Sequence, residues 1–563
     1  MNNSNQLHNI SIDFGTCNTV VSYKTDEKIM HIQDGITGDI LIPSTILFIK
    51  DEITPDLNIN NLEYLKHFVI GGAAKELEKS QTDTSSYFFQ FKRFLGITSK
   101  SPITSIEFIN KFNLRYELDD DTIYFFIPTQ DPDTWIKINS IDLTRLYLQG
   151  LYTIIKQTLN IVGDINIILT CPAYFNDLQR TQLKKATENA GFVVYKMYNE
   201  PTTAAVYYIH NFNELTVESN KFIVYDLGGG TIDTTVIEYH IDSKTCDIVD
   251  IDGNNSLGGI DIDNILISDI YNKYSIDKTN KKWVNRIRKY AEEIKIKLSY
   301  SNSYEIVLEN VPICKQNNQV NIQDTLIIKY TTHVFNSLIN NIIDQMIEPI
   351  ITMSKKYSTT NIIFIGGPTQ IPLLQTKVSA ILNINSNNII LNHHNNNLYK
   401  TIVADGASIL FELLNAKSEF CLLDIVPMNI GIGSPDDKMT IMINKNSKIP
   451  VTVERVFTTS HDCQRSIDID IYEGINELCS SNSYIGSYKI IGIPPLPRGS
   501  IIIKLLFKIS YNGILNISIN GYKNPSDDSA KSFDFKLCEK IKLIPNMIAK
   551  ELLRKLLGKN KSE

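Results

Sequence analysis

The sequence lacks long apolar runs: none approaches the roughly 18 consecutive apolar residues that a transmembrane helix needs. Residues 1–8 are polar and do not contain the apolar centre of a secretory signal peptide. We therefore expect a cytoplasmic, globular protein without a membrane partner.

Clustered cysteine and excess basic charge are also missing. The 8 cysteines lie far apart along 563 residues without a CxxC pair, which argues against a zinc ribbon or a disulfide framework and favours a reducing compartment. A formal net charge of −7 gives no basic field for nucleic-acid binding. The remaining composition, 43% hydrophobic and 21% charged, is typical of a globular chain long enough for two or three domains.

The sequence does contain two similar motifs, each after a strand-like apolar run: Asp13-Phe14-Gly15-Thr16, and Asp226 to Thr231 with three successive glycines between them. Glycine allows backbone amides to approach a phosphate closely, and carboxylates suit a Mg²⁺ ion that keeps most of its water ligands. One such motif is often an ordinary strand turn. The pair predicts two halves of one cleft that binds ATP with Mg²⁺.

The pattern along the chain predicts four regions. Residues 1–415 alternate strand and helix patterns, as in an α/β domain, and include a helix with Asp177 as its N-cap and Gly191 just beyond its end. Residues 416–426 form a short, apolar linker. Alternating strands over 427–535, with a hairpin turn at Tyr511-Asn512-Gly513, predict a β-sandwich. An apolar stripe in 536–563 predicts a short terminal helix.

Nine segments in order make the chain resemble the heat-shock protein 70 chaperone family over residues 10 to about 525. They are IDFGT at 12–16, FKRFLG at 91–96, PAYFND at 172–177, NEPTTAA at 199–205, DLGGGTID at 226–233, LGGIDIDN at 257–264, IGGPTQIP at 365–372, GIPPLPRG at 492–499 and NGILNIS at 512–518. The resemblance implies an actin-like ATPase domain with a duplicated ribonuclease-H-like fold, a regulatory linker and a peptide-binding β-sandwich. It also implies weak ATP hydrolysis, unfolded polypeptide clients, a J-domain partner and a nucleotide-exchange factor.

The resemblance further assigns roles to single residues. The implied catalytic residues are Lys92, Glu200, Thr231 and Asp233, and the implied carboxylates for Mg²⁺, mainly through water, are Asp13 and Asp226. Further nucleotide contacts are implied for Gly15, Thr16, Cys17, Gly228, Gly229, Gly230, Gly258, Glu292, Lys295, Ser299, Gly366, Gly367 and Gln370. Pro172, Leu422, Leu423 and Asp424 match the positions that couple the two domains.

The chemistry of phosphoryl transfer to water agrees with these roles, since it needs positioning and charge stabilisation rather than a covalent nucleophile. Lys92 would supply positive charge, and Glu200 or Asp233 would orient the water. Taken alone, however, Lys92 could equally be a solvated surface lysine, and Glu200 a carboxylate at a helix start.

The chain departs from the family at the nucleoside end. Ile296 and Gln370 stand where the family has arginines, Pro368 replaces a serine, and Cys17 replaces a threonine. A cation stacked on an aromatic ring contributes about 0.5–2 kcal/mol, so we expect weaker ATP binding and looser base discrimination with intact phosphate recognition. A redox role for Cys17 and a passive substitution both remain open.

The peptide side is also altered. Ile432, Phe457 and Ile467, with Met428 and Ile430 beside them, match the family's apolar peptide pocket, although Phe457 and Ile467 could be sandwich core instead. The residues after Gly521 are too few for the family's helical lid, so we expect a truncated lid.

Two other functions stay open: an ATP-binding co-chaperone, exchange factor or structural assembly protein with little ATPase activity, and a small-molecule kinase.

Overall fold

The computed structural model divides the chain into two compact units. The first comprises Met1–Met428 with Lys445–Ile449 and Tyr511–Ile514, and the second comprises Asn429–Asn444, Pro450–Ser510 and Leu515–Glu563. The residues that the structure describes are 8–25, 28–78, 86–101, 109, 114–119, 122–211, 220–314, 320–384, 389–390, 398–415, 420–523, 532–533 and 536–539.

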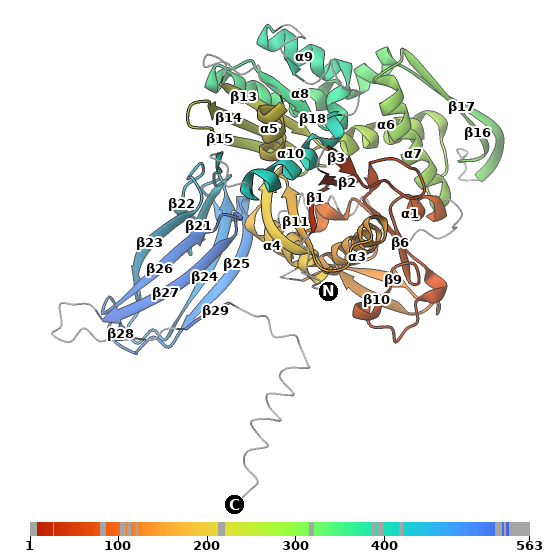
Figure 1. The fold of residues 1–563 in the computed structure, drawn as a ribbon. Helices are drawn as coiled ribbons and strands as arrows, with labels where there is room; N and C mark the ends of the chain where they lie inside the picture. Colours follow the sequence, from red (N-terminus) through yellow and green to blue (C-terminus); the bar gives the residue numbers. More distant parts are fainter. Residues whose placement is uncertain are drawn as a thin grey trace, which may run out of the picture. The chain divides into compact units, whose positions relative to one another are not determined.

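The first unit contains a sheet of order β12-β11-β1-β2-β3, with β4 paired to β2. Figure 1 labels β1, β2, β3 and β11 of this sheet. β1 (His8–Phe14) lies between parallel β11 (Ile165–Cys171) and antiparallel β2 (Asn18–Lys24). The other strands are β3 (Ile29–His31), β4 (Ile42–Pro43) and β12 (Val193–Asn199). Helix α10 (Leu398–Asn415) packs on β1 and β2.

A second sheet in the same unit repeats this arrangement, in the order β19-β18-β13-β14-β15-β20. β13 (Lys221–Leu227) lies between parallel β18 (Ile362–Ile365) and antiparallel β14 (Ile232–His240). The remaining strands are β15 (Thr245–Asn254), β19 (Ile389–Ile390) and β20 (Cys421–Leu423). The Asp13 and Asp226 motifs therefore occupy equivalent hairpin turns, β1–β2 and β13–β14, of two similar sheets.

The other elements of this unit connect and extend the two sheets. They are α1 (Gly71–Glu78), α3 (Ser140–Leu159), α4 (Asp177–Asn189), α5 (Glu200–Asn211), α6 (Gly259–Tyr274), α7 (Lys281–Leu298), α8 (Thr332–Tyr357), α9 (Pro372–Leu382), the 3₁₀ helices η3 (Phe91–Phe94) and η5 (Gly367–Gln370), β5 (Thr45–Phe48), β6 (Phe68–Ile70), β7 (Tyr87–Phe89), β8 (Tyr116–Leu118), β9 (Ile123–Pro128), β10 (Trp135–Asn139), β16 (Ser303–Cys314) and β17 (Val320–Thr331). Two short 3₁₀ helices, η1 (Lys50–Glu52) and η2 (Ile59–Asn61), lie between β5 and β6 in the sequence.

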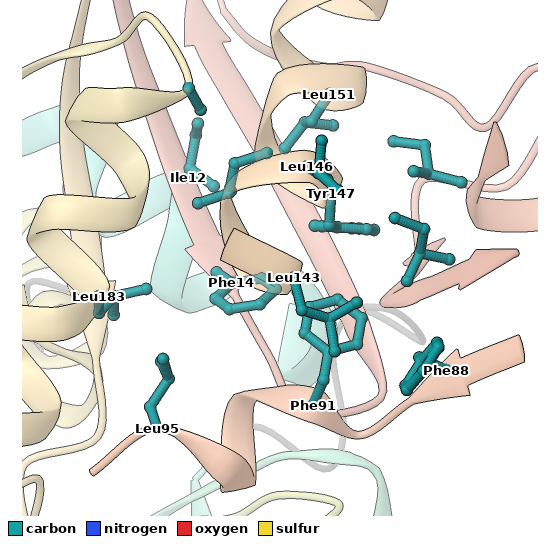
Figure 2. Close-up of a cluster of buried hydrophobic side chains, with 14 of the residues drawn as sticks. Ile12, Phe14, Phe88, Phe91, Leu95, Leu143, Leu146, Tyr147, Leu151 and Leu183 are labelled. Carbon is teal, nitrogen blue, oxygen red and sulfur yellow. The ribbon is translucent and has the colours of Figure 1, made fainter. Parts of the chain in front are cut away.

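An aromatic core fixes the position of η3 relative to β1. The rings of Phe14, Phe91 and Tyr147 are fully buried, with centroids 5.4–5.9 Å apart (Figure 2). Removing a buried phenylalanine ring costs about 3–5 kcal/mol, so this cluster holds the segment that carries Lys92 firmly against the strand that carries Asp13.

Local signals define α4. Its N-cap is Asn176, which accepts a hydrogen bond from the Gln179 amide, while the Gln179 side chain accepts one from the Asn176 amide. The N-cap prediction at Asp177 is therefore wrong by one residue, because Asp177 is the first residue of the helix. Gly191, with φ 106°, lies just beyond the helix end as predicted.

The second unit consists of two antiparallel sheets, β22-β21-β24-β25-β29 and β23-β26-β27-β28. Its elements are β21 (Asn429–Gly433), β22 (Met439–Ile443), β23 (Val451–Thr458), β24 (Ser466–Gly474), η7 (Cys479–Ser481), β25 (Ser483–Ile491), β26 (Ile501–Ile509), β27 (Leu515–Lys523), β28 (Ser532–Phe533) and β29 (Lys536–Glu539). The predicted turn at 511–513 does join two paired strands, with Ile509 opposite Leu515. Along β26, buried and partly exposed residues alternate, which places one face of the strand in the apolar interior.

Two predictions concern the C-terminal part of the chain. The predicted terminal helix lies outside the described residues. The proposed boundary at residue 536 falls on a strand instead, because Lys536–Glu539 form β29 and pair with β25. Among the helices that are described, none has the combined length and apolar character needed to cross a membrane.

Candidate functional site

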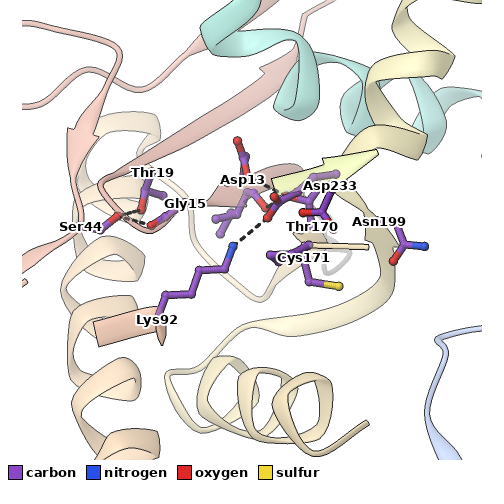
Figure 3. Close-up of polar contacts among 12 residues, drawn as sticks. Asp13, Gly15, Thr19, Ser44, Lys92, Thr170, Cys171, Asn199 and Asp233 are labelled. Carbon is purple, nitrogen blue, oxygen red and sulfur yellow. Dashed lines mark hydrogen bonds and ion pairs between the residues drawn. The ribbon is translucent and has the colours of Figure 1, made fainter. Parts of the chain in front are cut away.

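Acidic side chains from four elements converge around Lys92. Lys92 Nζ lies 2.7 Å from Glu200 Oε1, and both side chains are buried. Figure 3 labels Lys92 together with Asp13, Thr170 and Asp233. Asp13 is the second-last residue of β1 and pairs with Thr170 of β11, and its Oδ1 accepts a hydrogen bond of 3.0 Å from Thr170 Oγ1. Asp226 on β13 is the direct cross-strand partner of Asp233 on β14. A surface position for Lys92 is therefore excluded.

The charges in this cluster perturb one another. Burial, followed by the nearby charge of Glu200, raises the pKa of Asp13 and of Asp233 to about 7, and the same causes raise the pKa of Asp226 well above its ordinary value. Burial opposes the charge of Lys92, but Glu200 and Asp13 outweigh it and raise the lysine pKa. One lysine does not balance these carboxylates, so the cluster favours a further cation.

Asp233 is held at one oxygen and open at the other. Its Oδ1 accepts a hydrogen bond of 2.8 Å from the Tyr174 amide, whereas the buried Oδ2 has no partner among the described residues. Within the same residues, no three His, Cys, Asp or Glu side chains form a group that could hold a metal ion by themselves. The donor set fits Mg²⁺ bound through water and phosphate oxygens, with few direct protein ligands.

The two glycine motifs touch each other. A Cβ atom on Gly230 would lie 3.0 Å from Thr16 Cγ2, and one on Gly229 would lie 2.3 Å from Cys17 Sγ. Behind them, the amides of Gly259 and Ile260 donate to the carbonyls of Gly228 and Gly229, at 3.0 and 2.9 Å. The turns therefore form one backbone-lined surface from two halves of the chain.

Close approach requires glycine at three further positions of the site, whereas a Cβ on Gly228 would make only ordinary contacts, the nearest at 3.6 Å. A Cβ on Gly15 would meet Asn18 O at 2.3 Å, and one on Gly258 would meet the Gly229 and Gly230 backbone at 2.6 Å. Gly366, with φ 84°, would bring a Cβ to 2.1 Å from Leu227 O, whereas Gly367 has open space beside it. Thr16 and Thr231, one from each motif, are both buried.

Cys17 lies in a setting that disfavours redox chemistry. Burial, with a smaller contribution from Glu292, raises the pKa of the thiol to about 12. Because the thiolate is the reactive form, a thiol that stays protonated is a poor nucleophile. The structure supports the passive substitution over the redox thiol.

Lys295 is the centre of the predicted nucleoside end. Its ammonium group lies 2.8 Å from Asp263 Oδ2 and donates to Gly259 O at 3.0 Å, so it links α7 to the start of α6. Ser299 Oγ bonds back to Lys295 O, and Glu292 lies close enough to Lys295 to raise its pKa. The region adjoins the glycine turns, because a Cβ on Gly259 would meet Pro368 Cγ at 2.6 Å.

The substituted positions at this end carry no cation. Ile296 is 49% exposed on α7. The Gln370 amide group lies 3.4 Å from Thr369 Oγ1, its neighbour in η5. Neither side chain can replace the charge that a stacked arginine would supply.

The predicted linker adds a strand to the second sheet. In β20, Leu422 pairs with Cys246 and Leu423 with Asp247 of β15, in parallel. Asp424 follows directly and accepts two hydrogen bonds from Asn199 Nδ2, at 3.1 and 2.9 Å. Asn199 precedes Glu200, so the linker contacts the segment that carries the partner of Lys92. Residues 416–419 of the predicted linker lie outside the described residues.

A buried arginine joins Asp424 to Pro172. Arg180 donates to Asn199 Oδ1 at 2.7 Å and to the carbonyl oxygens of Pro172 and Ala173 at 3.4 and 2.9 Å. The same segment supplies the Tyr174 amide to Asp233. Hydrogen bonds therefore connect the linker, Pro172 and the carboxylate cluster within one unit.

The predicted peptide-pocket residues differ in exposure. Met428 and Ile430 are buried, whereas Ile432, Phe457 and Ile467 are only partly buried. Ile432 and Ile467 lie on β21 and β24 of one sheet, and Phe457 lies on β23 of the other.

Three buried polar residues of the first unit were not predicted from the sequence, namely Arg93, Arg180 and Asn199. Each lies inside or beside a motif used above, and only its burial distinguishes it from a surface residue.

Comparison with known proteins decides the family. A family model described as "Hsp70 protein" matches residues 9–531. The chain belongs to the Hsp70 family. Its relatives include the "Chaperone protein DnaK" of Ureaplasma urealyticum serovar 10, 28% identical over 531 residues that cover 92% of this chain and 78% of the relative. The protein of the same name from Ureaplasma parvum serovar 3 is 27% identical, covering 92% of this chain and 77% of the relative.

Proposed function

We propose that this member of the Hsp70 family is a molecular chaperone that uses ATP binding and hydrolysis to control its grip on unfolded polypeptide segments. One observation carries the proposal: the Thr16 and Gly230 turns meet beside a buried cluster of carboxylates around Lys92. An actin-like ATPase domain and a β-sandwich for peptides follow from the family.

Each side chain of the cluster has a task in this proposal. The glycine turns and the Thr16 and Thr231 hydroxyls bind the phosphate chain. Asp13 and Asp226 hold Mg²⁺ through its water ligands, and the ion supplies charge that offsets the phosphate oxygens. Glu200 fixes the Lys92 ammonium at 2.7 Å. Asp233, anchored at Oδ1 by the Tyr174 amide, keeps Oδ2 available to orient a water molecule.

The second unit and the linker complete the proposed cycle. Ile432, Phe457 and Ile467 line a pocket for one apolar side chain of an extended peptide, whose backbone adds hydrogen bonds to a strand. Leu422 and Leu423 couple the units through β20, with a coupling free energy of about 1–3 kcal/mol. A J-domain protein and a nucleotide-exchange factor are the proposed partners.

One observation favours the alternative of an ATP-binding co-chaperone or structural protein with little ATPase activity. Two positions of the nucleoside end carry no cation beside Lys295, since Ile296 is apolar and exposed and Gln370 bonds to its own 3₁₀ helix. Weak binding of the base would lower turnover without affecting the phosphate turns.

A single-turnover ATPase assay, with and without an unfolded peptide, separates the two functions. We expect measurable hydrolysis that the peptide accelerates, and a loss of about 100- to 1,000-fold in Lys92→Ala, the range for removal of one group that stabilises charge in a transition state. Lys50→Ala, an exchange outside the cluster, serves as the control. Equal rates in wild type and Lys92→Ala would contradict catalysis and favour the alternative.

A further inference from the structure

The three-stranded sheet β10-β9-β8 of the first unit has one face in the core and one face outside it. Along β9, which Figure 1 labels, buried and partly exposed residues alternate from residue 123 to residue 127. Ile123, Phe125 and Ile127 belong to the hydrophobic core of this unit, whereas Tyr124 and Phe126 are partly exposed and lie outside that core. The outer face therefore carries aromatic side chains where the solvated face of an antiparallel sheet normally carries polar ones.

The strand register identifies the neighbours of these two rings. Lys137 of β10 lies opposite Phe126, and Glu117 of β8 lies opposite Tyr124. The Phe126 amide also donates to the Arg115 carbonyl at 3.3 Å, so Arg115 lies on the other side of Phe126. Because residues directly opposite one another in paired strands present their side chains on the same face, these residues share the outer face.

Cations cover the aromatic rings of this face. Arg115 Cζ lies 4.6 Å from the ring centroid of Phe126 and 5.6 Å from that of Trp135 on β10. Lys137 Nζ lies 4.2 Å from the ring centroid of Tyr124. Trp135 is 37% exposed. Tryptophan, tyrosine and arginine are the residue types enriched in the hot spots of protein interfaces, so the outer face has the composition of an interaction surface.

The two cations differ in their charge partners. Lys137 Nζ lies 2.9 Å from Glu117 Oε2. The Arg115 guanidinium contacts the two rings and forms no hydrogen bond or ion pair with the part of the chain that the structure describes. A guanidinium that stacks through its faces keeps its N–H donors at the edge, where they fit a carboxylate in a bidentate arrangement.

The sign of the charge changes along the strands. Glu117 lies toward one end of the outer face, and the turn beyond the other end carries the exposed Asp131 and Asp133. Arg115 and Lys137 lie between these acidic ends. Acidic ends disfavour a polyanion such as single-stranded nucleic acid, although aromatic rings can stack on its bases. A polypeptide segment with a carboxylate in its middle and ammonium groups toward its ends has the complementary charge pattern.

We propose that the outer face of β8, β9 and β10 is a docking surface for an extended segment of a partner protein. A carboxylate in the middle of the segment binds the Arg115 guanidinium, apolar side chains beside it pack on Trp135 and Phe126, and basic residues flank them. The surface contains no residue of the carboxylate cluster around Lys92 or of the proposed peptide pocket. The inference therefore goes beyond the proposed function and does not rest on it.

Trp135 supplies a local readout for the experiment. The chain has 2 tryptophans, and the other one, Trp283, is 5% exposed. Acrylamide quenching of the fluorescence of the full chain therefore reports mainly on Trp135. A segment that covers the outer face should protect Trp135 from the quencher, whereas a peptide bound elsewhere leaves it accessible.

Three probes without tryptophan test the predicted charge pattern. They are a peptide of sequence Lys-Leu-Glu-Leu-Lys, the charge-reversed peptide Glu-Leu-Lys-Leu-Glu, and single-stranded oligothymidylate. We expect only the first to protect Trp135, with an affinity that falls as the salt concentration rises. No protection by the first peptide, or equal or stronger protection by either of the others, would overturn the inference.

Variants test the role of Arg115. Arg115→Gln should weaken the binding of Lys-Leu-Glu-Leu-Lys by about 5- to 30-fold, the range for the loss of a charge-assisted hydrogen-bonded pair. Glu117→Gln removes the charge partner of Lys137 and should bind the same peptide as tightly as wild type or up to about 5-fold more tightly. Lys66→Gln, an exchange of an exposed cation outside the sheet, is the matched control and should leave the affinity unchanged.

Two results with these variants would overturn the inference. One is a wild-type affinity in Arg115→Gln, and the other is a loss in Glu117→Gln as large as the loss in Arg115→Gln, which would make Arg115 a packing residue of the sheet. Should Arg115→Gln fail to fold, as judged by its melting transition, Arg115→Lys gives the same comparison. It keeps the charge without the planar fork and should lose about 2- to 5-fold in affinity.

Discussion

Asp233 is a single residue of the site whose charged form is disfavoured in the folded protein. It is buried, its pKa is raised to about 7 by burial and by Glu200, and one of its oxygens has no partner among the described residues. Such a group destabilises the folded protein wherever the unfolded chain would ionise more readily. The site therefore has a pH dependence of stability that a cation would suppress.

We expect Asp233→Asn to stabilise the protein at about pH 8 in the absence of Mg²⁺ and nucleotide. The folded-state pKa lies above the ordinary value of 3.8, so stability is lost as the pH rises from about 4 to about 7 and stays low above that. The variant should exceed wild type in unfolding free energy at pH 8 by up to about 4 kcal/mol, and match it near pH 4. Hydrolysis should fall in the same variant.

Denaturant unfolding at the two pH values measures this difference. The exposed Asp56→Asn exchange is the control and should show no such dependence. If Asp233→Asn and wild type lost stability in parallel between pH 4 and 7, the buried charge of Asp233 would not be the cause.

Residue-scale prediction from sequence succeeded where a motif carried a backbone requirement. Gly15, Gly258 and Gly366 all lie where a side chain would collide with the backbone. It was less successful for charged residues, because a sequence does not reveal which side of an element is buried. Lys92 and Arg93 are adjacent in FKRFLG, yet only the structure shows that both are buried and that they diverge.

At the scale of elements, β20 is the feature with the clearest consequence. It is only three residues long, yet it pairs with β15 and is followed by Asp424, which bonds to Asn199. Leu422 packs against the apolar clusters that contain Ile248 and Val206. The strand depends on apolar burial and on pairing at the same time.

Replacing Leu422 and Leu423 together by aspartate should detach β20 and abolish the acceleration of ATP turnover by peptide, with basal turnover retained. Steady-state ATPase rates with and without peptide provide the measurement. Cys421→Ser, an exchange at an exposed position of the same strand, should keep the acceleration. Undiminished peptide stimulation in the double variant would contradict coupling through β20.

Element boundaries were predictable where both ends carried a strong local signal. The end of α4 at Gly191 follows from a left-handed residue, and the β26–β27 turn from Asn512-Gly513. The start of α4 was misplaced because Asn176 and Asp177 are both good caps, and only the return bond from Gln179 selects Asn176. β29 was missed because short pairing with a distant strand leaves no periodic pattern in four residues.

At the scale of the whole molecule, two compact units share one chain. Ligands that bind only the folded form of one unit stabilise that unit by mass action, by about 2.7 kcal/mol at a concentration 100 times the dissociation constant. The proposed nucleotide residues all belong to the unit that contains Met1–Met428.

Calorimetric unfolding should consequently show two transitions, and Mg²⁺ with ATP should raise the midpoint temperature of only one of them. Two exchanges in the full chain identify which transition belongs to which unit: Lys92→Ala in the first unit and Lys504→Ala on β26 in the second. Each exchange should shift only the transition of its own unit. Equal displacement of both transitions by nucleotide would show that the two units unfold cooperatively and would contradict this prediction.

The parallel register of β20 also has a consequence for the chain when β20 leaves. Residues Thr245 to Asp247 of β15 would then expose a row of unpaired amide and carbonyl groups at the rim of a sheet. An extended segment of suitable shape can pair with such a rim. A short synthetic peptide that copies residues 420–424 should therefore compete with β20 for the edge of β15 and inhibit the coupling proposed through β20.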